Sequence, residues 1–225
     1  MRDSSRRLPT APLLAERADG LSPAFLALLA AEDLTGLTVL DVGTGRGRLA
    51  TTLAPRCGRV VGVDLDPLAI EQARRAAAGT PNVEFVLADA EATKYAAFAP
   101  DAIVAHLCMY DAIIERAGRA LRPGRVVVFA AFHADQWRET GRRSRFAYDE
   151  AQARRVLEAA GFGVEHLDVE REERRFASVE EGLGAAVALE EKWKADGRWF
   201  HYIKFLEEGG RTLTRSHLHI KARRR

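Results

Sequence analysis

The sequence is most readily understood from one stretch near its start, Val39-Leu40-Asp41-Val42-Gly43-Thr44-Gly45-Arg46-Gly47-Arg48-Leu49-Ala50. An apolar run ends in a loop with three glycines, and a helix is predicted to leave this loop. Gly43 and Gly45 let the backbone turn tightly and approach a ligand, because they have no Cβ atom. The start of the helix directs free backbone N–H groups and a positive dipole end at the loop. The stretch therefore predicts a ligand site between a strand and a helix.

Short apolar runs rich in β-branched residues recur after this stretch, with helix signals between them. Ser22-Pro23 and Asp66-Pro67 mark helix starts, because each is a capping residue followed by a proline at the first helical position. Strands separated by helices indicate βαβ units and a parallel sheet with both faces buried. We predict a doubly wound α/β fold with strands at 38–42, 59–63, 83–87, 101–106 and 125–130, and helices at 110–120 and 150–160.

The last third of the chain has a different pattern. Residues 164–176 alternate between apolar and charged side chains, which is typical of a strand that leaves the main sheet. Ser178-Val179-Glu180-Glu181 is a capping box that predicts a helix as far as Ala195. A second helix is expected at 199–208 and a last strand at 212–222. We expect an N-terminal arm and helix over 1–33, and one domain over 34–225 with a lid-like helical insertion at about 177–209.

The composition describes a globular protein with unevenly spread charge. Of its 225 residues, 47% are hydrophobic and 29% charged, which excludes a largely disordered chain, and the net charge of +2 excludes a strongly basic nucleic-acid binder. Residues 1–7 carry a net +2 and residues 211–225 a net +6, so the body between them is acidic. Two cysteines are too few for a disulfide framework, and no apolar run approaches the length of a membrane span. We expect a soluble, cytoplasmic protein.

The glycine pattern argues against a dinucleotide as the ligand. A dinucleotide-binding loop would need its third glycine at position 48, which is arginine here, whereas the third glycine is Gly47. Asp41 also lies outside that pattern and brings negative charge close to the loop. This charge suits a ligand with a cationic end better than a bare pyrophosphate.

At this point the sequence resembles a known family, the class I S-adenosylmethionine-dependent methyltransferases of the small-molecule type. The glycine stretch is similar to the first motif of that family, and four further segments follow in the expected order. The resemblance covers about residues 34–132 and implies a mostly parallel, seven-stranded sheet with its last strand antiparallel. The four further segments are 60–67, 85–90, 101–106 and 120–125, the last with Arg125 where a second glycine is usual.

The resemblance also implies which residues bind the cofactor. Asp64 stands where the family binds the ribose hydroxyls, and its place 17 residues after Gly47 suits that role in a related fold. Asp89 stands where the adenine amino group binds, with the Ala90 N–H beside it. S-adenosylmethionine, and S-adenosylhomocysteine as product, would be bound by Asp41, Gly43, Thr44, Gly45, Gly47, Asp64, Leu65, Asp89, Ala90 and His106.

Catalysis requires few residues, because alignment alone lowers much of the barrier to methyl transfer. His106 and His133 follow the fourth and fifth strands and are candidates for a general base, with a structural role as the alternative for each. Cys108 is disfavoured as a nucleophile, and we predict no metal site. Tyr110, Trp199 and Tyr202 are candidates to wall the acceptor pocket; alternatively, the aromatic residues of the C-terminal third join its helices to the sheet.

Three functions remain open at this stage. A methyltransferase for a small-molecule acceptor is favoured, with nucleic acid and membrane as unfavoured partners. An RNA methyltransferase would use the basic ends of the chain, and a non-catalytic protein would only bind S-adenosylmethionine. A dehydrogenase is the least favoured alternative. The sequence specifies neither the methyl acceptor, nor the atom that is methylated, nor the oligomeric state.

Overall fold

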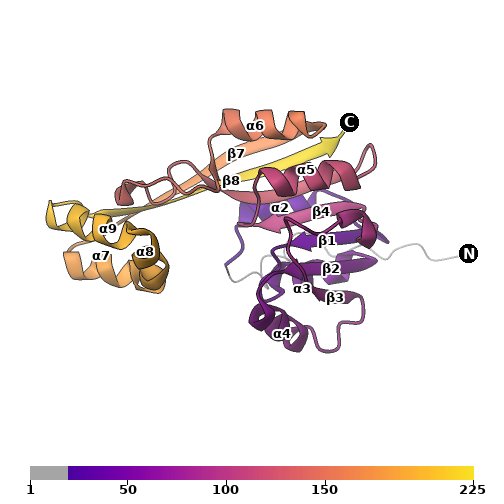
Figure 1. Cartoon of the computed structure of the whole chain (residues 1–225), viewed down its shortest axis with the longest axis horizontal. Helices are drawn as coiled ribbons and strands as arrows, with labels where there is room; N and C mark the ends of the chain where they lie inside the picture. Colours follow the sequence, from indigo (N-terminus) through magenta and orange to yellow (C-terminus); the bar gives the residue numbers. More distant parts are fainter. Residues whose placement is uncertain (1–19) are drawn as a thin grey trace, which may run out of the picture.

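The strands of the described residues form one sheet. The computed structural model describes residues 20–225, and the rest of the predicted N-terminal arm lies outside them. The path through the sheet explains the position of the site, because strand order reverses between β1 and β4. In spatial order the strands are β3 (Val83–Leu87), β2 (Arg59–Asp64), β1 (Thr38–Val42), β4 (Ala102–His106), β5 (Val126–His133), β8 (Thr212–Arg224) and β7 (Phe162–Arg175) (Figure 1).

The directions of the strands confirm the predicted fold class. Strands β1 to β5 run parallel to one another, and β8 runs antiparallel to β5. One strand was not predicted: β6 (Ala147–Tyr148) pairs with Phe132 and His133, beyond the point where β4 ends beside Ala130. The sheet therefore has eight strands rather than seven, since this two-residue strand extends the edge that β4 leaves free.

Helices cover both faces of the sheet. The predicted caps Ser22 and Asp66 start two of them, and Asp149, which was not predicted, starts a third. Each side chain accepts a bond from a backbone N–H group of the first turn. One buried cluster joins the sheet to α5 and α6, and a second joins it to α2, α3 and α4. The bounds are α2 (Pro23–Ala30), α3 (Arg48–Leu53), α4 (Pro67–Ala76), α5 (Asp111–Ala120) and α6 (Glu150–Ala159). In the described part of the chain, no helix is long and apolar enough to cross a bilayer.

A long antiparallel hairpin, β7 and β8, carries the helical lid. The hairpin projects from the sheet, and α7, α8 and α9 lie together at its far end (Figure 1). The predicted single helix from 178 to 195 is interrupted by a 3-10 turn at Val187–Leu189. The lid helices, α7 (Val179–Ala186), α8 (Glu190–Asp196) and α9 (Arg198–Glu207), enclose a buried cluster of their own, built around Trp193, Tyr202 and Leu206.

The basic C-terminal end is part of the sheet. Lys221 and Arg223 lie in β8, and their charged groups contact Glu32 at 2.7 and 2.9 Å. Glu165, at a bulge in β7, contacts both basic residues as well. Most of the basic residues expected at this end are therefore either paired with carboxylates or part of strand β8.

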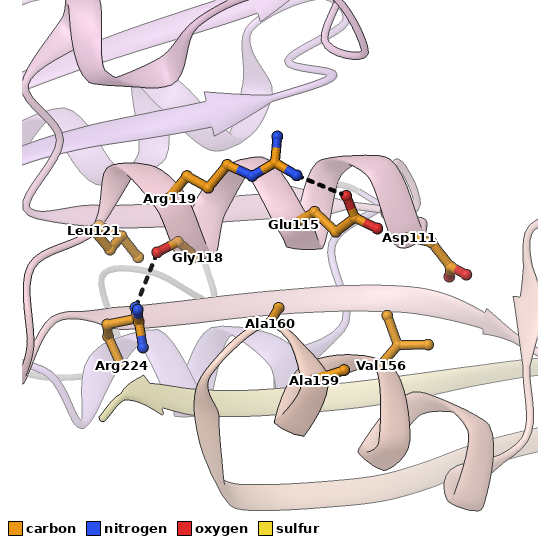
Figure 2. A pocket seen from close by; sticks show the side chains of 9 residues that line it. All are labelled: Asp111, Glu115, Gly118, Arg119, Leu121, Val156, Ala159, Ala160 and Arg224. Atoms are coloured by element: carbon orange, nitrogen blue, oxygen red, sulfur yellow. Dashed lines mark hydrogen bonds and ion pairs between the residues drawn. The ribbon is translucent and has the colours of Figure 1, made fainter.

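Arg224 closes a seam between two helices. Its Nε donates to the carbonyl of Gly118 in α5 at 2.9 Å, and its Nη1 donates to the carbonyl of Gly161 at 2.8 Å. A Cβ atom on Gly118 would come within 2.3 Å of the Ala160 carbonyl oxygen, so α5 and α6 meet closely at this glycine. The pocket of about 710 Å³ beside this seam is therefore a gap between packed helices (Figure 2).

Candidate active site

Two of the three glycines in the glycine loop, residues 43–47, are Gly43 and Gly45, and their surroundings differ. Both have positive φ angles, +68° at Gly43 and +54° at Gly45, which favour glycine. A Cβ on Gly43 would lie 2.3 Å from Cys108 Sγ, so this glycine lets the segment after β4 approach the loop. A Cβ on Gly45 would meet no described atom within 4 Å. The backbone at Gly45 therefore borders open space where a ligand can approach.

Asp41 lies beneath the glycine loop and is 1% exposed. Its Oδ2 accepts a hydrogen bond from the Thr44 hydroxyl at 2.6 Å. Burial raises the pKa of Asp41 to about 7, although hydrogen bonds from Thr44 and from the Ala50 backbone act in the opposite direction. The structure thus shows Asp41 holding the loop from below, while its action on a cationic ligand stays a prediction.

Asp64 joins the ends of β1 and β2. Its Oδ2 accepts from the Gly45 backbone N–H at 2.7 Å, and its Oδ1 accepts from the Asp66 N–H at 3.0 Å. Each carboxylate oxygen has about two acceptor positions, so the half-buried group retains capacity for two hydroxyl donors. Leu65, which follows it, is 68% exposed. A large apolar side chain in that position is suited to pack against a flat aromatic ring.

Asp89 and Ala90 follow β3 at the same edge of the sheet. Asp89 is exposed, and its Oδ1 accepts from the Glu91 N–H at 2.8 Å. The Ala88 N–H donates to the Asp64 carbonyl at 2.9 Å, so the ends of β2 and β3 remain paired up to this point. The sheet brings these predicted residues together beside the glycine loop. Gly47 instead packs inward, since a Cβ there would lie 2.6 Å from the Phe85 ring.

These features fit S-adenosylmethionine. The open backbone at Gly45 leaves room for the amino-acid portion, Asp64 can accept from the two ribose hydroxyls, and Leu65 offers an apolar surface to the adenine. Each of these residues lies at the carboxyl end of a parallel strand or in the turn after it, where ligands of open α/β sheets bind.

A cavity of about 770 Å³ lies beyond the ends of β4 and β5, and we call it the hairpin cavity. Residues from both the sheet and the lid line it. From the body of the molecule come His106, Leu107, Phe132 and Trp137, and from the hairpin Glu170 and His217. Its volume lies within the range of about 300–1,000 Å³ that is usual for small-molecule sites.

His106 is the predicted catalytic residue that lines the hairpin cavity. Burial lowers its pKa to about 4, and the nearby charges of Arg48, His219 and Arg215 act in the same direction. The imidazole is therefore neutral near pH 7 and can accept a proton. Leu107 has a φ of +60°, which is uncommon for a residue with a side chain. Within this turn His106 lines the cavity while Cys108 contacts the glycine loop.

His133, the second predicted base, lies outside the lining of the hairpin cavity. Its Nδ1 lies 2.9 Å from the Ser216 hydroxyl and accepts from the Asp135 N–H at 3.2 Å. Its Nε2 lies 3.4 Å from a carboxylate oxygen of Glu150. Both ring nitrogens thus have structural neighbours, which favours the structural alternative for this histidine.

The predicted acceptor residues are not gathered at the hairpin cavity. Tyr110 lines a separate pocket of about 280 Å³, where its hydroxyl donates to Glu91 at 2.9 Å. Trp199 and Tyr202 are buried in the lid, with Tyr202 fully enclosed. They pack around Trp193, which lies 6.4 and 5.5 Å from them between ring centroids. The lid aromatics therefore stabilise the lid, and its residues on the cavity are Ala185, Leu189 and Lys192.

Cys108 is placed against the glycine loop as a protonated thiol. Burial raises its pKa to about 12, and the carboxylates of Asp64 and Asp41 add to this effect. A thiol with so high a pKa has little nucleophilic thiolate near neutral pH. This environment argues against Cys108 as a nucleophile, as the sequence does.

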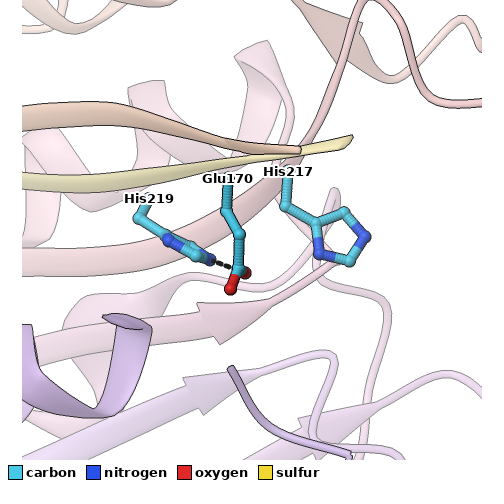
Figure 3. Close-up of side chains that lie close together, drawn as sticks. All are labelled: Glu170, His217 and His219. Carbon is cyan, nitrogen blue, oxygen red and sulfur yellow. Dashed lines mark ion pairs between the residues drawn. The ribbon is translucent and has the colours of Figure 1, made fainter. Parts of the chain in front are cut away.

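Sequence reasoning missed a cluster of three residues on the hairpin. Glu170, His217 and His219 place donor atoms within 4.8 Å of one another (Figure 3). Two histidines separated by one residue in a predicted strand share one face, which was the only local signal. Glu170 joins them through the pairing of β7 with β8, and this register cannot be read from either segment alone.

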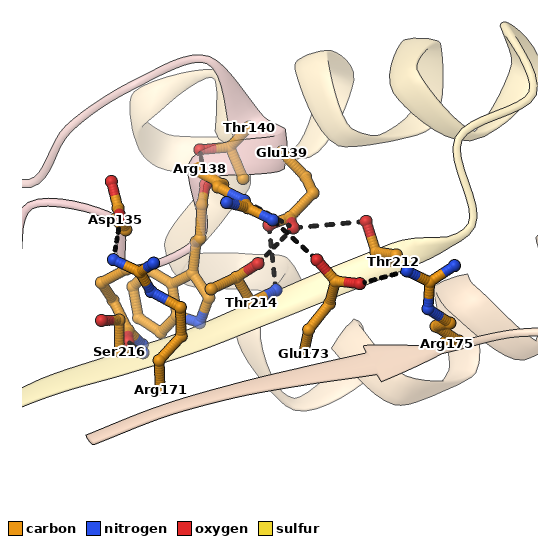
Figure 4. Close-up of polar contacts among 12 residues, drawn as sticks. Asp135, Arg138, Glu139, Thr140, Arg171, Glu173, Arg175, Thr212, Thr214 and Ser216 are labelled. Atoms are coloured by element: carbon orange, nitrogen blue, oxygen red, sulfur yellow. Dashed lines mark hydrogen bonds and ion pairs between the residues drawn. The ribbon is translucent and has the colours of Figure 1, made fainter. Parts of the chain in front are cut away.

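The loop after β5 braces the hairpin near the lid. Glu139 is buried, and its two carboxylate oxygens accept from the Thr214 N–H at 3.0 Å and the Thr214 hydroxyl at 2.5 Å (Figure 4). Gln136 accepts from the Ser216 N–H at 2.6 Å. Trp137 packs edge-on against Trp193 of the lid, with ring centroids 5.2 Å apart. This loop therefore ties the sheet, the projecting strand and the lid together.

Comparisons with known proteins agree with the fold. A family model described as a methyltransferase domain matches residues 39–124. The S-adenosylmethionine-dependent methyltransferase from Mesorhizobium loti has a TM-score of 0.60 at 19% identity, covering 92% of this chain and 100% of that one. The YcgJ protein from Bacillus subtilis has a TM-score of 0.69 at 16% identity, covering 91% and 99%. Both likenesses show a shared fold.

A curated relative matches over a shorter region. The ribosomal RNA small subunit methyltransferase A of Rubrobacter xylanophilus is 42% identical over 62 residues, which is 28% of this chain. The match spans about a quarter of that protein, 24% of its length. Residues 39–124 of this chain therefore match a methyltransferase domain, and the chain shares the fold of an S-adenosylmethionine-dependent methyltransferase.

Proposed function

We propose that this protein transfers a methyl group from S-adenosylmethionine to a small molecule held in the hairpin cavity. One observation carries the proposal: the turn after β4 borders the glycine loop through Cys108 and the cavity through His106. A cofactor at the loop and an acceptor in the cavity would therefore lie on the two sides of one short turn. This proximity is the main requirement for an in-line transfer.

The residues have separable roles in this proposal. S-adenosylmethionine supplies a methyl group on a positively charged sulfur. Asp64 orients the ribose, and Asp89 with the Ala90 N–H holds the adenine. If the acceptor is an alcohol, a ring nitrogen of the neutral His106 takes its proton; an amine that is already unprotonated needs no base.

The lining of the hairpin cavity indicates a polar acceptor with an apolar part. Phe132, Trp137 and Leu189 supply apolar surface, while Lys192 and Arg174 supply positive charge. The RNA alternative has less support, because the C-terminal basic residues Lys221 and Arg223 are paired with carboxylates. The sequence match to an RNA methyltransferase covers only 62 residues, which is 28% of this chain.

The cofactor site is tested by calorimetry with S-adenosylhomocysteine. We expect Asp64→Ala to weaken binding at least about 10-fold, because two charge-assisted hydrogen bonds to the ribose are lost. Asp66→Ala is the matched control: it removes the cap of α4 and costs about 1 kcal/mol of stability, but affinity should be retained. Unchanged affinity in Asp64→Ala would refute the ribose assignment.

Turnover is tested with a labelled methyl donor and a panel of small-molecule alcohols, amines, thiols and RNA. We expect a small acceptor to be labelled. If that acceptor is an alcohol, His106→Ala should lower kcat by a larger factor than it lowers the affinity for S-adenosylhomocysteine. Labelling of RNA alone would establish the RNA alternative. Tight cofactor binding without labelling of any acceptor would favour the non-catalytic alternative.

A further inference from the structure

Glu170 and His217, which line the hairpin cavity, and His219, which lies close to them outside the lining, form a set that methyl transfer from S-adenosylmethionine does not require. We propose that Glu170, His217 and His219 bind one divalent transition-metal ion of the zinc type. Two histidines and a glutamate are a known ligand set for catalytic zinc, with further coordination positions left to water or substrate. Neither the binding itself nor its main test depends on the proposed methyl transfer.

The hairpin fixes the backbone positions of the three ligands. His217 and His219 are two residues apart in β8 and therefore point to the same face of the sheet. Glu170 is the direct partner of His217 across the β7–β8 ladder. Their donor atoms lie within 4.8 Å of one another. In a tetrahedral site with bonds of about 2.0–2.1 Å, ligand atoms are about 3.3 Å apart, so adjustments of side-chain torsions suffice to close the site.

The buried side chain of His219 lacks a hydrogen-bond partner among the described residues. Its side chain is 1% exposed, and neither ring nitrogen has a hydrogen-bond partner among the described residues. Its Nε2 lies 3.4 Å from Glu170 Oε2, but the arrangement lacks hydrogen-bond geometry. A buried polar group without a partner costs about 1–3 kcal/mol. Coordination of a metal by one ring nitrogen would remove that cost and explain why a histidine occupies this position.

The carboxylate of Glu170 is not held by an arginine. In the described part of the chain, the neighbouring cation Arg215 pairs with Glu172 at 3.0 Å, and Arg171 contacts Asp135. Among the described residues, the carboxylate of Glu170 instead lies beside His219, with Oε2 3.4 Å from Nε2. The positive charge of Arg215 is therefore offset by its own partner, and Glu170 remains available to a metal ion.

The open coordination positions would face the hairpin cavity. Glu170 and His217 line it together with His106, while His219 is outside the lining. If the proposed methyl transfer is correct, the ion would bind an acceptor hydroxyl or thiol and lower its pKa. The released proton goes to His106 or to water. The acceptor atom then forms its bond to the methyl carbon as the methyl–sulfur bond breaks, leaving its electron pair on sulfur.

The test is metal binding by the full chain after treatment with a chelator. Titration with zinc, followed by calorimetry, should show one ion per chain, and Co²⁺ in its place should give the absorption bands of a low-symmetry site. His219→Ala and Glu170→Gln should each weaken binding more than about 100-fold, since even the loss of an outer partner of a ligand costs about 10–100-fold. The matched control is His166→Ala, an exposed histidine on the same hairpin.

Two measurements keep the outcomes distinct. Retained affinity for S-adenosylhomocysteine shows that a variant is folded, and Glu170→Gln provides a conservative change should His219→Ala fail to fold. The proposal is overturned by absence of stoichiometric binding, or by binding that His166→Ala weakens as much as Glu170→Gln does. Failure of the cofactor test at Asp64 would overturn the methyltransferase proposal and leave the metal result standing.

Discussion

Asp41 lies within β1 and Asp101 directly precedes the neighbouring strand β4, yet their surroundings shift their pKa values in opposite directions. Burial raises the pKa of Asp41 to about 7. At Asp101, burial also raises the pKa, but bonds from the Thr38 backbone and from Arg122, with the charge of Arg125, outweigh it and leave a lowered value. A carboxyl group with a raised pKa in the folded state destabilises the fold once it is ionised.

Asp41→Asn should therefore change how stability depends on pH. Between the unfolded pKa of 3.8 and the folded pKa of about 7, the native protein holds the Asp41 proton while the unfolded chain releases it. Its stability thus falls as pH rises through this window and is level above it. We expect urea unfolding at pH 8 to find the variant more stable by about 1–3 kcal/mol, with the difference vanishing near pH 4. Parallel pH profiles would contradict the assignment.

Asp101→Asn should have the opposite sign. Because its folded pKa is lowered, Asp101 contributes stability above the unfolded pKa of 3.8, and this contribution is lost as pH falls through the folded value. Near neutral pH the variant should lose about 1–2 kcal/mol. The same urea series serves as the measurement, and a loss that persists undiminished at pH 2 would show that packing rather than charge is responsible.

At the scale of elements, β8 turns the basic C-terminus into a structural segment. Residues 221–223 pair with β5 on one side and residues 221–224 with β7 on the other, and Ala222 is fully buried. Removal of residues 221–225 should lower Tm by about 10 °C or more, because about 1 kcal/mol corresponds to about 2–4 °C in a chain of this size.

The control for this truncation is Arg225→Ala, which keeps the strand and removes one exposed charge. Its stability should remain within about 0.5 kcal/mol of the parent. If the truncated chain melted at the same temperature as the full chain, the structural role of this end would be wrong. Because the truncation damages the sheet, a loss of RNA affinity in the truncated chain would not by itself show that the basic residues contact phosphates.

The elements were predictable where local sequence specifies them. Strands β1 and β3 have the predicted bounds, because each is a compact apolar run between turn signals. β6 was missed, since two residues carry no periodicity. The break at Val187–Leu189 was also missed, because a capping box marks where a helix starts and carries no information on where packing interrupts it.

The proposed cofactor residues rest on similarly local signals, since the glycine loop and Asp64 belong to short motifs; their binding roles stay predictions. The burial of Trp199 and Tyr202 depends on how three helices pack together, and the position of Glu170 depends on hairpin register. Those features are tertiary, so one sequence without its fold gives only weak signals for them. The same holds for His133, whose neighbours Ser216 and Glu150 are distant in the chain.

At the scale of the whole molecule, cofactor and acceptor binding should be separable. The lid has its own buried cluster, and its two ends meet where the Phe176 N–H donates to the Arg211 carbonyl at 2.9 Å. Residues 177–210 can therefore be replaced by Asn-Gly, a pair that closes antiparallel strands in a tight turn. We expect affinity for S-adenosylhomocysteine to stay within about threefold, and methyl transfer to a small acceptor to be lost.

Calorimetry and labelled-methyl transfer on the same preparation would check this expectation. A variant that still methylates the same acceptor at the parental rate would show that the lid wall of the cavity is dispensable. A variant that loses the cofactor as well would show that the lid supports the glycine loop across the molecule.

The pairing of β8 has a mechanical consequence. Support from β5 ends at the pair Phe132–His217, and beyond it residues 212–216 pair only with β7. The projecting part of the β7–β8 hairpin is thus held in the sheet at one end only, and it carries the three lid helices at the other end. We expect the hairpin to bend beside His217, where the pairing with β5 ends. Just beyond that point, Gln136 and Glu139 accept hydrogen bonds from the backbone N–H groups of Ser216 and Thr214. We expect these hydrogen bonds, rather than a flexible loop, to limit how far the hairpin cavity can widen to admit the proposed acceptor.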